Sequence, residues 1–358
     1  MAAIEHHLKL LCDADGPSGY EDEVRRLIVA EAMRHTSKIE VDSLGNVFAE
    51  IKGAQSSPKL MIAAHMDEVG LMIRYVEDTG FLRFSTIGGI DPRILPAQRV
   101  KLKAKQNCVG VVGSKPPHIL SPDEMKKPFE MSDLYVDIGA SSREEVNRLD
   151  VDVGTVAVFD TPFKHTSIEN VVVGKALDDR SGCTAALEIM NSLARDPPNS
   201  TVVFAFTVQE EVGLRGASVA ANRINPDLAL VLETSVAADS PDIMPRDRIA
   251  SMGRGPVVRV LDSTMITQRP MLQFIKNTAE RNSIPYQLHV SLTGGTDAGR
   301  IHISGSGVPT GVLSTPCRYL HGPSLMLNLT DLNHLAKLGD FIVRGINSSK
   351  IKYDQEIA

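Results

Sequence analysis

The sequence predicts an α/β protein: a three-layer α/β/α domain with a mostly parallel sheet, and a small all-β, barrel-like domain inserted into it. Three observations support this class. A continuous apolar run in the first third of the chain is typical of a strand covered on both faces. Short β-prone runs follow it, without a long amphipathic helix. Strand-like and helix-like segments then alternate, which is typical of a parallel sheet flanked by helices.

These patterns divide the chain into two expected domains. Residues 1–68 and 166–358 form the larger, discontinuous domain, and residues 69–165 form the insertion. We treat the smaller domain as inserted because the alternation of strands and helices resumes after it. With 358 residues, of which 42% are hydrophobic, the chain is long enough to bury a substantial core.

The N-terminal elements lead directly to polar side chains. Ser18 and Glu21 have the spacing of a capping box, which predicts a helix whose apolar face includes Val24 and Ile28. The apolar run at residues 59–64 then predicts a buried strand, and it ends on the segment His65-Met66-Asp67-Glu68.

The later elements follow from the same patterns. In the insertion, short runs separated by turn residues predict strands at 71–76, 81–85, 99–104, 109–112, 134–138 and 155–159. After it, helices are expected at 181–195, 215–223, 272–281 and 329–342. Strands are expected between them at 201–208, 228–232 and 308–313.

Composition excludes several classes of function. A net charge of −6 argues against a nucleic-acid groove, which needs a basic face. No stretch approaches the ~18 apolar residues that span a bilayer, and the first residues do not have the pattern of a secretory signal. The four cysteines lie far apart, without a CxxC pair, and are expected to be reduced thiols. We therefore expect a cytoplasmic protein without nucleic-acid or membrane partners.

Histidines and carboxylates follow the predicted strands. In an open α/β sheet, ligands bind beyond the carboxyl ends of the strands. The side chains expected at this edge are His65, Asp67, Asp178, Asp179, Glu210, Glu211, Glu233 and His321. Each has an ordinary structural explanation, since an Asp pair before a helix is usually a cap. Their convergence on one edge predicts a metal site, because imidazole and carboxylate are ligands that zinc accepts.

Five motifs occur in a fixed order along the chain. They are HMDEVG at 65–70, KALDDRSG at 175–182, EEVGLRG at 210–216, GGTDAG at 294–299 and HGP at 321–323. Together they resemble the tetrahedral (TET) aminopeptidases, also called the glutamyl-aminopeptidase and endoglucanase-like family of dinuclear metallopeptidases. The resemblance extends from about residue 8 to about residue 346.

This resemblance implies two metal sites that share one carboxylate. The ligands of the first would be His65, Asp178 and Glu233, and those of the second Asp178, Glu211 and His321. Glu210 would be the general base, and Asp67 would orient His65. The resemblance also implies that the insertion is a dimerisation domain, and that dimers assemble into a hollow dodecamer.

Two positions need comment. Spacing alone does not decide between Asp178 and Asp179 as the bridging ligand; we choose Asp178 because it stands four residues before Gly182, a spacing that recurs in related dinuclear peptidases. The position of Glu233 is usually Asp in the family. Glu can still bind a metal, so the change bears on metal preference or affinity.

Simple chemistry supports these roles. Two divalent ions can polarise a carbonyl group and lower the pKa of a bound water molecule. With three carboxylate ligands and two neutral imidazoles, the pair of ions would keep a net charge of about +1, which would attract an oxyanion. Glu210 and Glu211 are adjacent and cannot both point the same way, so one ligating and one free carboxylate is the natural division. Zinc or cobalt are the expected ions, and manganese is compatible with the same ligands.

The sequence therefore predicts a metal-dependent aminopeptidase that removes N-terminal residues from peptides. Gly295, Thr296 and Asp297 belong to a segment whose backbone freedom suits either a plain turn or a loop that approaches a ligand closely, and we assign it to substrate binding. One alternative is a deacylase of another small amide. A glycoside hydrolase acting on glucans is a second, although that chemistry needs no histidine-bound metal. A non-enzymatic assembly or binding protein is a third, although every motif position is filled.

Overall fold

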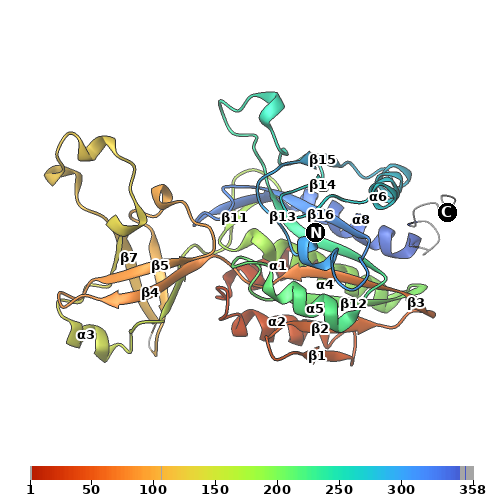
Figure 1. The fold of residues 1–358 in the computed structure, drawn as a ribbon, viewed down its shortest axis with the longest axis horizontal. Coiled ribbons are helices and arrows are strands. Elements are labelled where there is room, and N and C mark those ends of the chain that lie inside the picture. Colours follow the sequence, from red (N-terminus) through yellow and green to blue (C-terminus); the bar gives the residue numbers. More distant parts are fainter. Residues whose placement is uncertain (1, 106, 347–350, 352–358) are drawn as a thin grey trace.

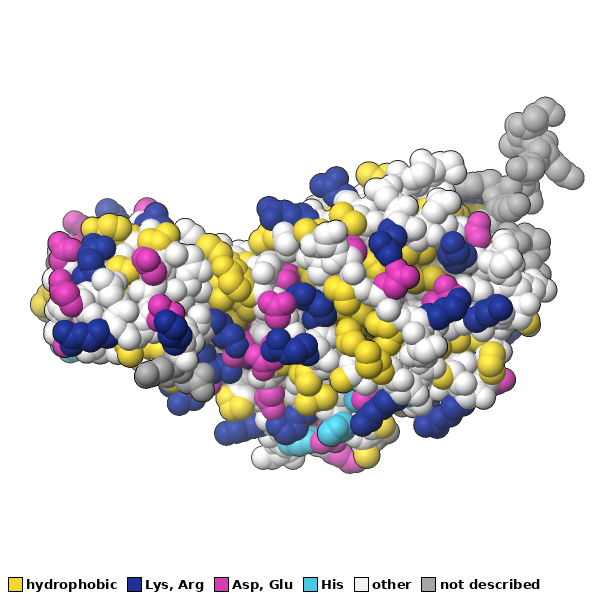
Figure 2. All heavy atoms as spheres, turned by 90° about the horizontal axis from the view of Figure 1, so that it is seen from below, with side chains coloured by type: hydrophobic (Ala, Val, Ile, Leu, Met, Phe, Trp, Pro, Cys, Tyr) yellow, Lys and Arg dark blue, Asp and Glu magenta, His cyan; other side chains and the backbone are white. Residues whose placement is uncertain are grey.

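In the computed structural model, which describes residues 2–105, 107–346 and 351, a large sheet with its helices lies at one end and a small barrel at the other (Figure 1). A narrower neck joins the two, and basic and acidic side chains are interspersed on the face shown in Figure 2. The end of the expected range 166–358 lies partly outside the described residues. Within them, no helix combines the length and apolar character needed to cross a membrane.

Four parallel strands form the centre of the large sheet. They are, in spatial order, β12 (Ser200–Thr207), β3 (Gln55–His65), β13 (Leu228–Val236) and β16 (Thr310–Arg318). Antiparallel strands extend it beyond β12 as β2 (Val47–Ile51) and β1 (Ile39–Val41), and beyond β16 as β17 (Leu325–Asn328), β11 (Val171–Gly174) and β10 (Lys164–His165). Strand β14 (Val257–Leu261) pairs with β16 and with β15 (Gln287–Val290).

Helices cover both faces of this sheet because its central strands are apolar on both sides. On β3, Leu60 and Ile62 pack in one core with helices α1 (Ala2–Asp13), α2 (Asp22–Ala32), α4 (Leu177–Arg195), α6 (Arg269–Arg281) and α8 (Leu329–Gly345). The alternate residues Met61 and Ala63 pack in another core with α5 (Arg215–Ile224) and α7 (Ala298–Ile301). The predicted three-layer α/β class is therefore confirmed.

The insertion forms a closed six-stranded barrel with its own apolar core. The strands run in the order β4 (Gly70–Val76), β5 (Leu82–Ile87), β8 (Tyr135–Asp137), β7 (Asn107–Gly113), β6 (Arg99–Lys103) and β9 (Val156–Phe159). The connections add helix α3 (Arg143–Arg148) and the 3-10 turns η1 (Pro92–Ile94), η2 (Pro117–Ile119), η3 (Glu124–Lys126) and η4 (Met131–Asp133); η5 (Pro245–Asp247) lies in the larger body. All six strands predicted in this region are present.

The capping box predicted at Ser18 and Glu21 is wrong. Helix α2 begins at Asp22, and the Ser18 hydroxyl instead donates to the Asp67 carboxylate at 2.6 Å. The Glu21 carboxylate accepts the N–H groups of Gly19 and Gln209, at 2.7 and 3.1 Å. Ser18 therefore contacts the loop that follows β3, and Glu21 contacts the loop that follows β12. Their side chains do not form the predicted capping box of α2.

Candidate metal centre

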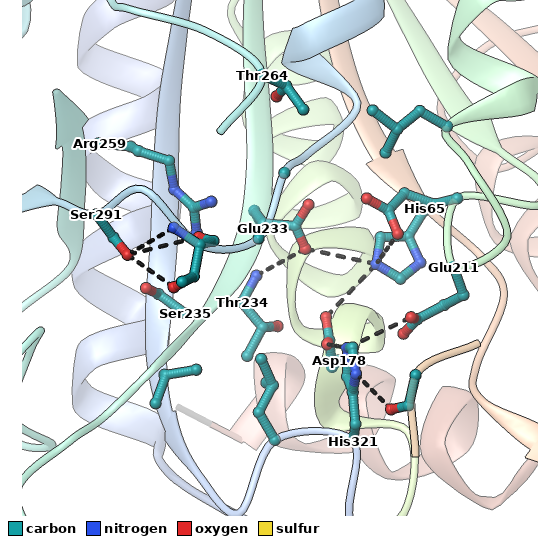
Figure 3. Close-up of a pocket in the computed structure, with 18 of the residues that line it drawn as sticks. His65, Asp178, Glu211, Glu233, Thr234, Ser235, Arg259, Thr264, Ser291 and His321 are labelled. Atoms are coloured by element: carbon teal, nitrogen blue, oxygen red, sulfur yellow. Dashed lines mark hydrogen bonds and ion pairs between the residues drawn. The ribbon is translucent and has the colours of Figure 1, made fainter. Parts of the chain in front are cut away.

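The predicted ligands converge at the carboxyl edge of the four parallel strands. His65 is the last residue of β3 and stands opposite Thr207, the last residue of β12. Glu210 and Glu211 follow β12 within four residues. Glu233 lies inside β13 and not after it, because that strand continues beyond the predicted end to Val236. His321 follows β16 and faces the same point (Figure 3).

Asp178 lies between the two histidines. Its Oδ1 is 3.4 Å from His65 Nε2, and its Oδ2 is 3.4 Å from His321 Nε2. His65 Nε2 is also 3.4 Å from Glu233 Oε1, and His321 Nε2 is 3.3 Å from Glu211 Oε2. The five side chains thus form two groups of three that share Asp178.

These separations fit metal ligation. Two donor atoms at about 2.1 Å from one ion, at tetrahedral angles, lie roughly 3.4 Å apart. The Oδ1 atom of Asp178 is buried and accepts no hydrogen bond from any described residue. A buried carboxylate oxygen in that position is costly unless a cation or donor satisfies it. The residues present therefore fit the binding of divalent metal ions.

Asp179 belongs to neither of the two groups that share Asp178. Its Oδ1 accepts the N–H of Gly182 at 2.9 Å and the hydroxyl of Thr234 at 3.1 Å. A Cβ on Gly182 would lie 2.2 Å from the other Asp179 oxygen, so the first turn of α4 closes on this carboxylate. The geometry favours Asp178 over Asp179 as the shared ligand.

Backbone carbonyls orient both histidines. His65 Nδ1 is 3.1 Å from the carbonyl oxygen of Asp67, and His321 Nδ1 is 2.8 Å from that of Gly89. A carbonyl can only accept, so each Nδ1 carries the proton and each Nε2 is free to bind a metal. Gly89 belongs to the loop after β5 of the barrel. Its neighbour Gly88 has φ +79°, and a Cβ there would lie 3.2 Å from Glu211 Cβ, so only glycine fits this close approach.

The Asp67 carboxylate is fully buried and connects three segments. It accepts the N–H of Glu210 at 3.0 Å, the N–H of Glu211 at 3.1 Å and the Ser18 hydroxyl. The His65 Nδ1 is farther away, at 3.5 Å from Oδ1. Burial would raise the pKa of Asp67, but hydrogen bonding and the His65 charge hold it below its usual value. Asp67 therefore fixes the backbone that carries the two glutamates.

The centre holds more negative than positive charge. Burial, with the nearby charges of Asp178 and Asp67, raises the pKa of Glu211 to about 8, against the effect of His321. Burial would lower the pKa of His321, but Asp178 and Glu211 outweigh it and raise that pKa to about 9. The pKa values are raised because the charged side chains described at this centre do not fully balance the negative charge of its carboxylates. Bound divalent ions would supply that compensation.

Only part of the predicted substrate loop reaches the cavity. The cavity has a volume of about 520 Å³ and is lined by Gly295 together with the ligands. Thr296 and Asp297 are each 1% exposed and are not part of its lining. The Asp297 carboxylate accepts the hydroxyl of Thr207, and burial raises its pKa to about 7.

A buried charge cluster next to the predicted ligands was not predicted from the sequence. Glu68 accepts the Lys175 ammonium at 2.7 Å and the N–H of Gly16 at 2.9 Å. Arg180, which is fully buried, donates to the carbonyls of Leu11 and Ala14. The cluster holds the loop between α1 and α2 against both metal-ligand motifs. The sequence did contain a hint of this cluster, because each of its charged residues stands within three positions of a predicted metal ligand.

Replacing Asp67 with Asn is expected to weaken Zn²⁺ binding by about 10–100-fold, the usual cost of removing a carboxylate that supports metal ligands. The amide keeps the size of the side chain but loses the charge that holds the N–H groups of Glu210 and Glu211. Zn²⁺ affinity measured by competition with a chelator checks this. Ser18→Ala is the matched control, because it removes one donor and leaves the charge; unchanged affinity in Asp67→Asn would contradict the role.

The sequence and the fold are both similar to those of known aminopeptidases. Residues 45–338 match the family described as M42 glutamyl aminopeptidase. The chain is 35% identical to a lysyl aminopeptidase of Pyrococcus furiosus, over 92% of this chain and 94% of the relative. A TET aminopeptidase from a Thaumarchaeota archaeon of marine sediment has a TM-score of 0.95 at 37% identity, covering 98% of both chains. The TET1 peptidase of Pyrococcus horikoshii, which can assemble into a tetrahedron or a large octahedral shell, has a TM-score of 0.85 at 35% identity, covering 96% of this chain and 100% of that one.

Proposed function

This chain belongs to the M42 glutamyl aminopeptidase family and is an aminopeptidase, and we propose that it removes N-terminal residues from peptides with the help of two divalent metal ions. The observation that carries the proposal is Asp178, whose two oxygens face two different histidines at 3.4 Å. A single buried carboxylate between two imidazoles is the arrangement expected of a shared ligand.

Each ion would have three protein ligands. The first would be held by His65, Asp178 and Glu233, and the second by Asp178, Glu211 and His321. Zinc or cobalt suit this set of imidazole and carboxylate donors, and manganese is compatible with it. When bound, such a pair of ions supplies Lewis-acid activation of water and of the scissile carbonyl.

Glu210 would be the general base. It belongs to neither of these two sets, although it forms a third possible group with His65 and Glu211, and its Oε2 lies 4.0 Å from His65 Nε2. Its carboxylate would take a proton from the attacking water as the C–O bond forms, and would deliver it to the amine as the C–N bond breaks. Burial, helped by the charges of Glu233 and Glu211, holds the pKa of Glu210 well above its usual value.

The barrel would provide contacts between subunits of a homo-oligomer built from dimers, with a dodecamer as one possible form. The assembly of the Pyrococcus horikoshii TET1 peptidase into closed shells supports this proposal. Exposed apolar side chains on the barrel support it as well; they are Val109, Val111, Ile119 and Met125.

Peptides with a free N-terminus should be shortened one residue at a time, and N-acetylated copies should react about 10²-fold more slowly. The carboxylates that line the cavity can attract an α-ammonium group, whereas acetylation removes its charge and adds bulk. Mass spectrometry of the digest checks this.

Internal fragments would contradict the exopeptidase proposal and indicate an endopeptidase. Equal cleavage of capped and free peptides would indicate a deacylase. Soluble β-glucan is the control for glycosidase chemistry, which needs two carboxyl groups but no histidine ligands, and it should release no reducing sugar.

A further inference from the structure

Four consecutive backbone N–H groups after β12 donate to side chains from remote segments of the chain. They belong to residues 208–211, which we call the base segment because it carries the proposed general base. The first donates to Asn46 Oδ1 at 3.0 Å, and the second to Glu21 Oε1 at 3.1 Å. The third and fourth donate to the two carboxylate oxygens of Asp67, at 3.0 and 3.1 Å. Since β12 ends at Thr207, these side chains take the place of a neighbouring strand.

The three acceptor side chains are buried. Asn46 and Asp67 are 0% exposed, and Glu21 is 2% exposed. A buried N–H group without an acceptor costs free energy, so each of these contacts favours one arrangement of the backbone. The base segment is therefore held at every one of its residues, although it lies outside the strands of the sheet.

Gln209 is the strained residue of the base segment. Its φ is +56°, in the left-handed region that residues other than glycine seldom adopt. Such a conformation persists only where the surrounding contacts impose it. The N–H group of Gln209 is the one bound by Glu21, and the same carboxylate oxygen also accepts the N–H of Gly19 at 2.7 Å. The side chain of Gln209 bonds to Arg215 at the surface, so the buried contact of this residue is the one with Glu21.

Glu21 and Asp67 hold different parts of the base segment. Asp67 binds the N–H groups of both Glu210 and Glu211, so its loss bears on the proposed general base and on a proposed ligand together. Glu21 binds the residue that precedes the general base, and it belongs to none of the groups of possible metal ligands found among the described residues. Because a change of φ at residue 209 rotates the chain that follows it, Glu210 is the first residue that such a change displaces.

We propose that Glu21 is a positioning residue for the reaction: by holding the left-handed turn at Gln209, its carboxylate sets the position of the Glu210 carboxylate at the metal centre. This inference rests on the proposed function, in which Glu210 is the general base. It gives the segment between α1 and α2 a role in the rate of the reaction, and not only in the stability of the fold.

The test compares Glu21→Met with Glu21→Gln, two changes that keep the size of the side chain but differ in the acceptor. The assay uses Zn²⁺-loaded enzyme and the aminoacyl p-nitroanilide that the wild-type protein cleaves fastest. Glu21→Met should lower kcat at least about tenfold, because a displacement of about 1 Å at a reacting group can cost about 10²-fold in rate. KM and Zn²⁺ content should stay within about twofold of the wild-type values. Glu21→Gln keeps an oxygen that can accept both N–H groups, so it should retain most of the wild-type kcat.

A double-mutant cycle with Glu210 separates positioning from stability. If Glu21 acts through the general base, Glu21→Met should have almost no effect on kcat in the Glu210→Gln background, where that base is already lost. A loss of the same size in both backgrounds would assign Glu21 a structural role and overturn the inference. An unchanged kcat in Glu21→Met alone would overturn it too, as would a loss of kcat that is explained by a loss of Zn²⁺.

Asp331→Ala is the matched control, since Asp331 is another buried carboxylate that accepts two backbone N–H groups of a loop. Its partners are Gly253 and Gly255, at 2.5 and 2.7 Å, and none of these three residues lines the cavity. This variant should lower the melting temperature, as Glu21→Met should, but keep the wild-type kcat per folded protein.

If Glu21→Met does not fold, Gln209→Val tests the same turn, because a β-branched residue disfavours a positive φ. It should lower kcat with Zn²⁺ retained, and an unchanged kcat would overturn the inference. A full kcat in Glu210→Gln would instead refute the general base of the proposed function, and this inference with it. Failure to cleave any aminoacyl substrate in the presence of Zn²⁺ or Co²⁺ would refute the proposed function itself.

Discussion

Glu210→Gln should lower kcat by at least about 10²-fold and leave the metal content near that of the wild-type protein. The amide preserves the shape of the side chain but cannot accept the proton of water. Glu210 stands outside the two ligand sets that share Asp178, although it also lies close enough to His65 and Glu211 to form a third group. On the proposed division of roles, its replacement should leave both ions bound. Steady-state kinetics together with metal analysis of the same preparation check this.

Glu211→Gln is the matched control, since it changes the adjacent residue in the same way. Glu211 Oε2 lies 3.3 Å from His321 Nε2, and its replacement should lower metal content. If Glu210→Gln loses metal and Glu211→Gln keeps it, the division of roles between the two glutamates is reversed.

Removal of divalent ions with a chelator should abolish activity, and addition of Zn²⁺ or Co²⁺ should restore it. A positioned general base alone increases the rate only about 10²–10⁴-fold, so the rest of the rate enhancement should depend largely on the ions. Metal analysis should give two ions per chain. His65→Ala and His321→Ala should each lower that number, because each histidine belongs to a different pair of ligands around Asp178.

His302→Ala is the control for these two variants. His302 bonds to the carbonyl of Ala298 within α7 and its following turn, and it does not line the cavity. Its replacement should keep both ions. Full activity in a metal-free preparation would contradict the assignment of the centre.

The fold and the ligand edge could be predicted because the information is local in the sequence. The strand that ends at His65 is an unbroken apolar run, and burial on both faces requires such a run. Parallel strands bring their carboxyl ends to one edge, so the residues after each run had to meet there. Glu233 fits the same logic, although β13 continues past it.

Other features could not be predicted because their partners are remote in sequence or have no residue-specific signature. Ser18 and Glu21 have a spacing that also suits a helix cap, and only tertiary contacts with Asp67 and Gln209 decide otherwise. Gly89 acts through a backbone carbonyl, which any residue type provides. Arg259 lies outside every motif, and only the pairing of β14 with β16 brings it to the cavity.

The carbonyl of Gly89 makes the barrel a working part of the active centre. It accepts the Nδ1 proton of His321, a proposed metal ligand that belongs to the larger domain. Any movement between the barrel and the sheet would therefore change the position of His321 Nε2. Neighbouring subunits that brace the barrel would brace this ligand as well. We therefore expect a change that destabilises the barrel to lower both the size of the assembly and the metal content. Deleting the barrel should affect both properties at once, so a deletion does not show which of them depends on the barrel directly.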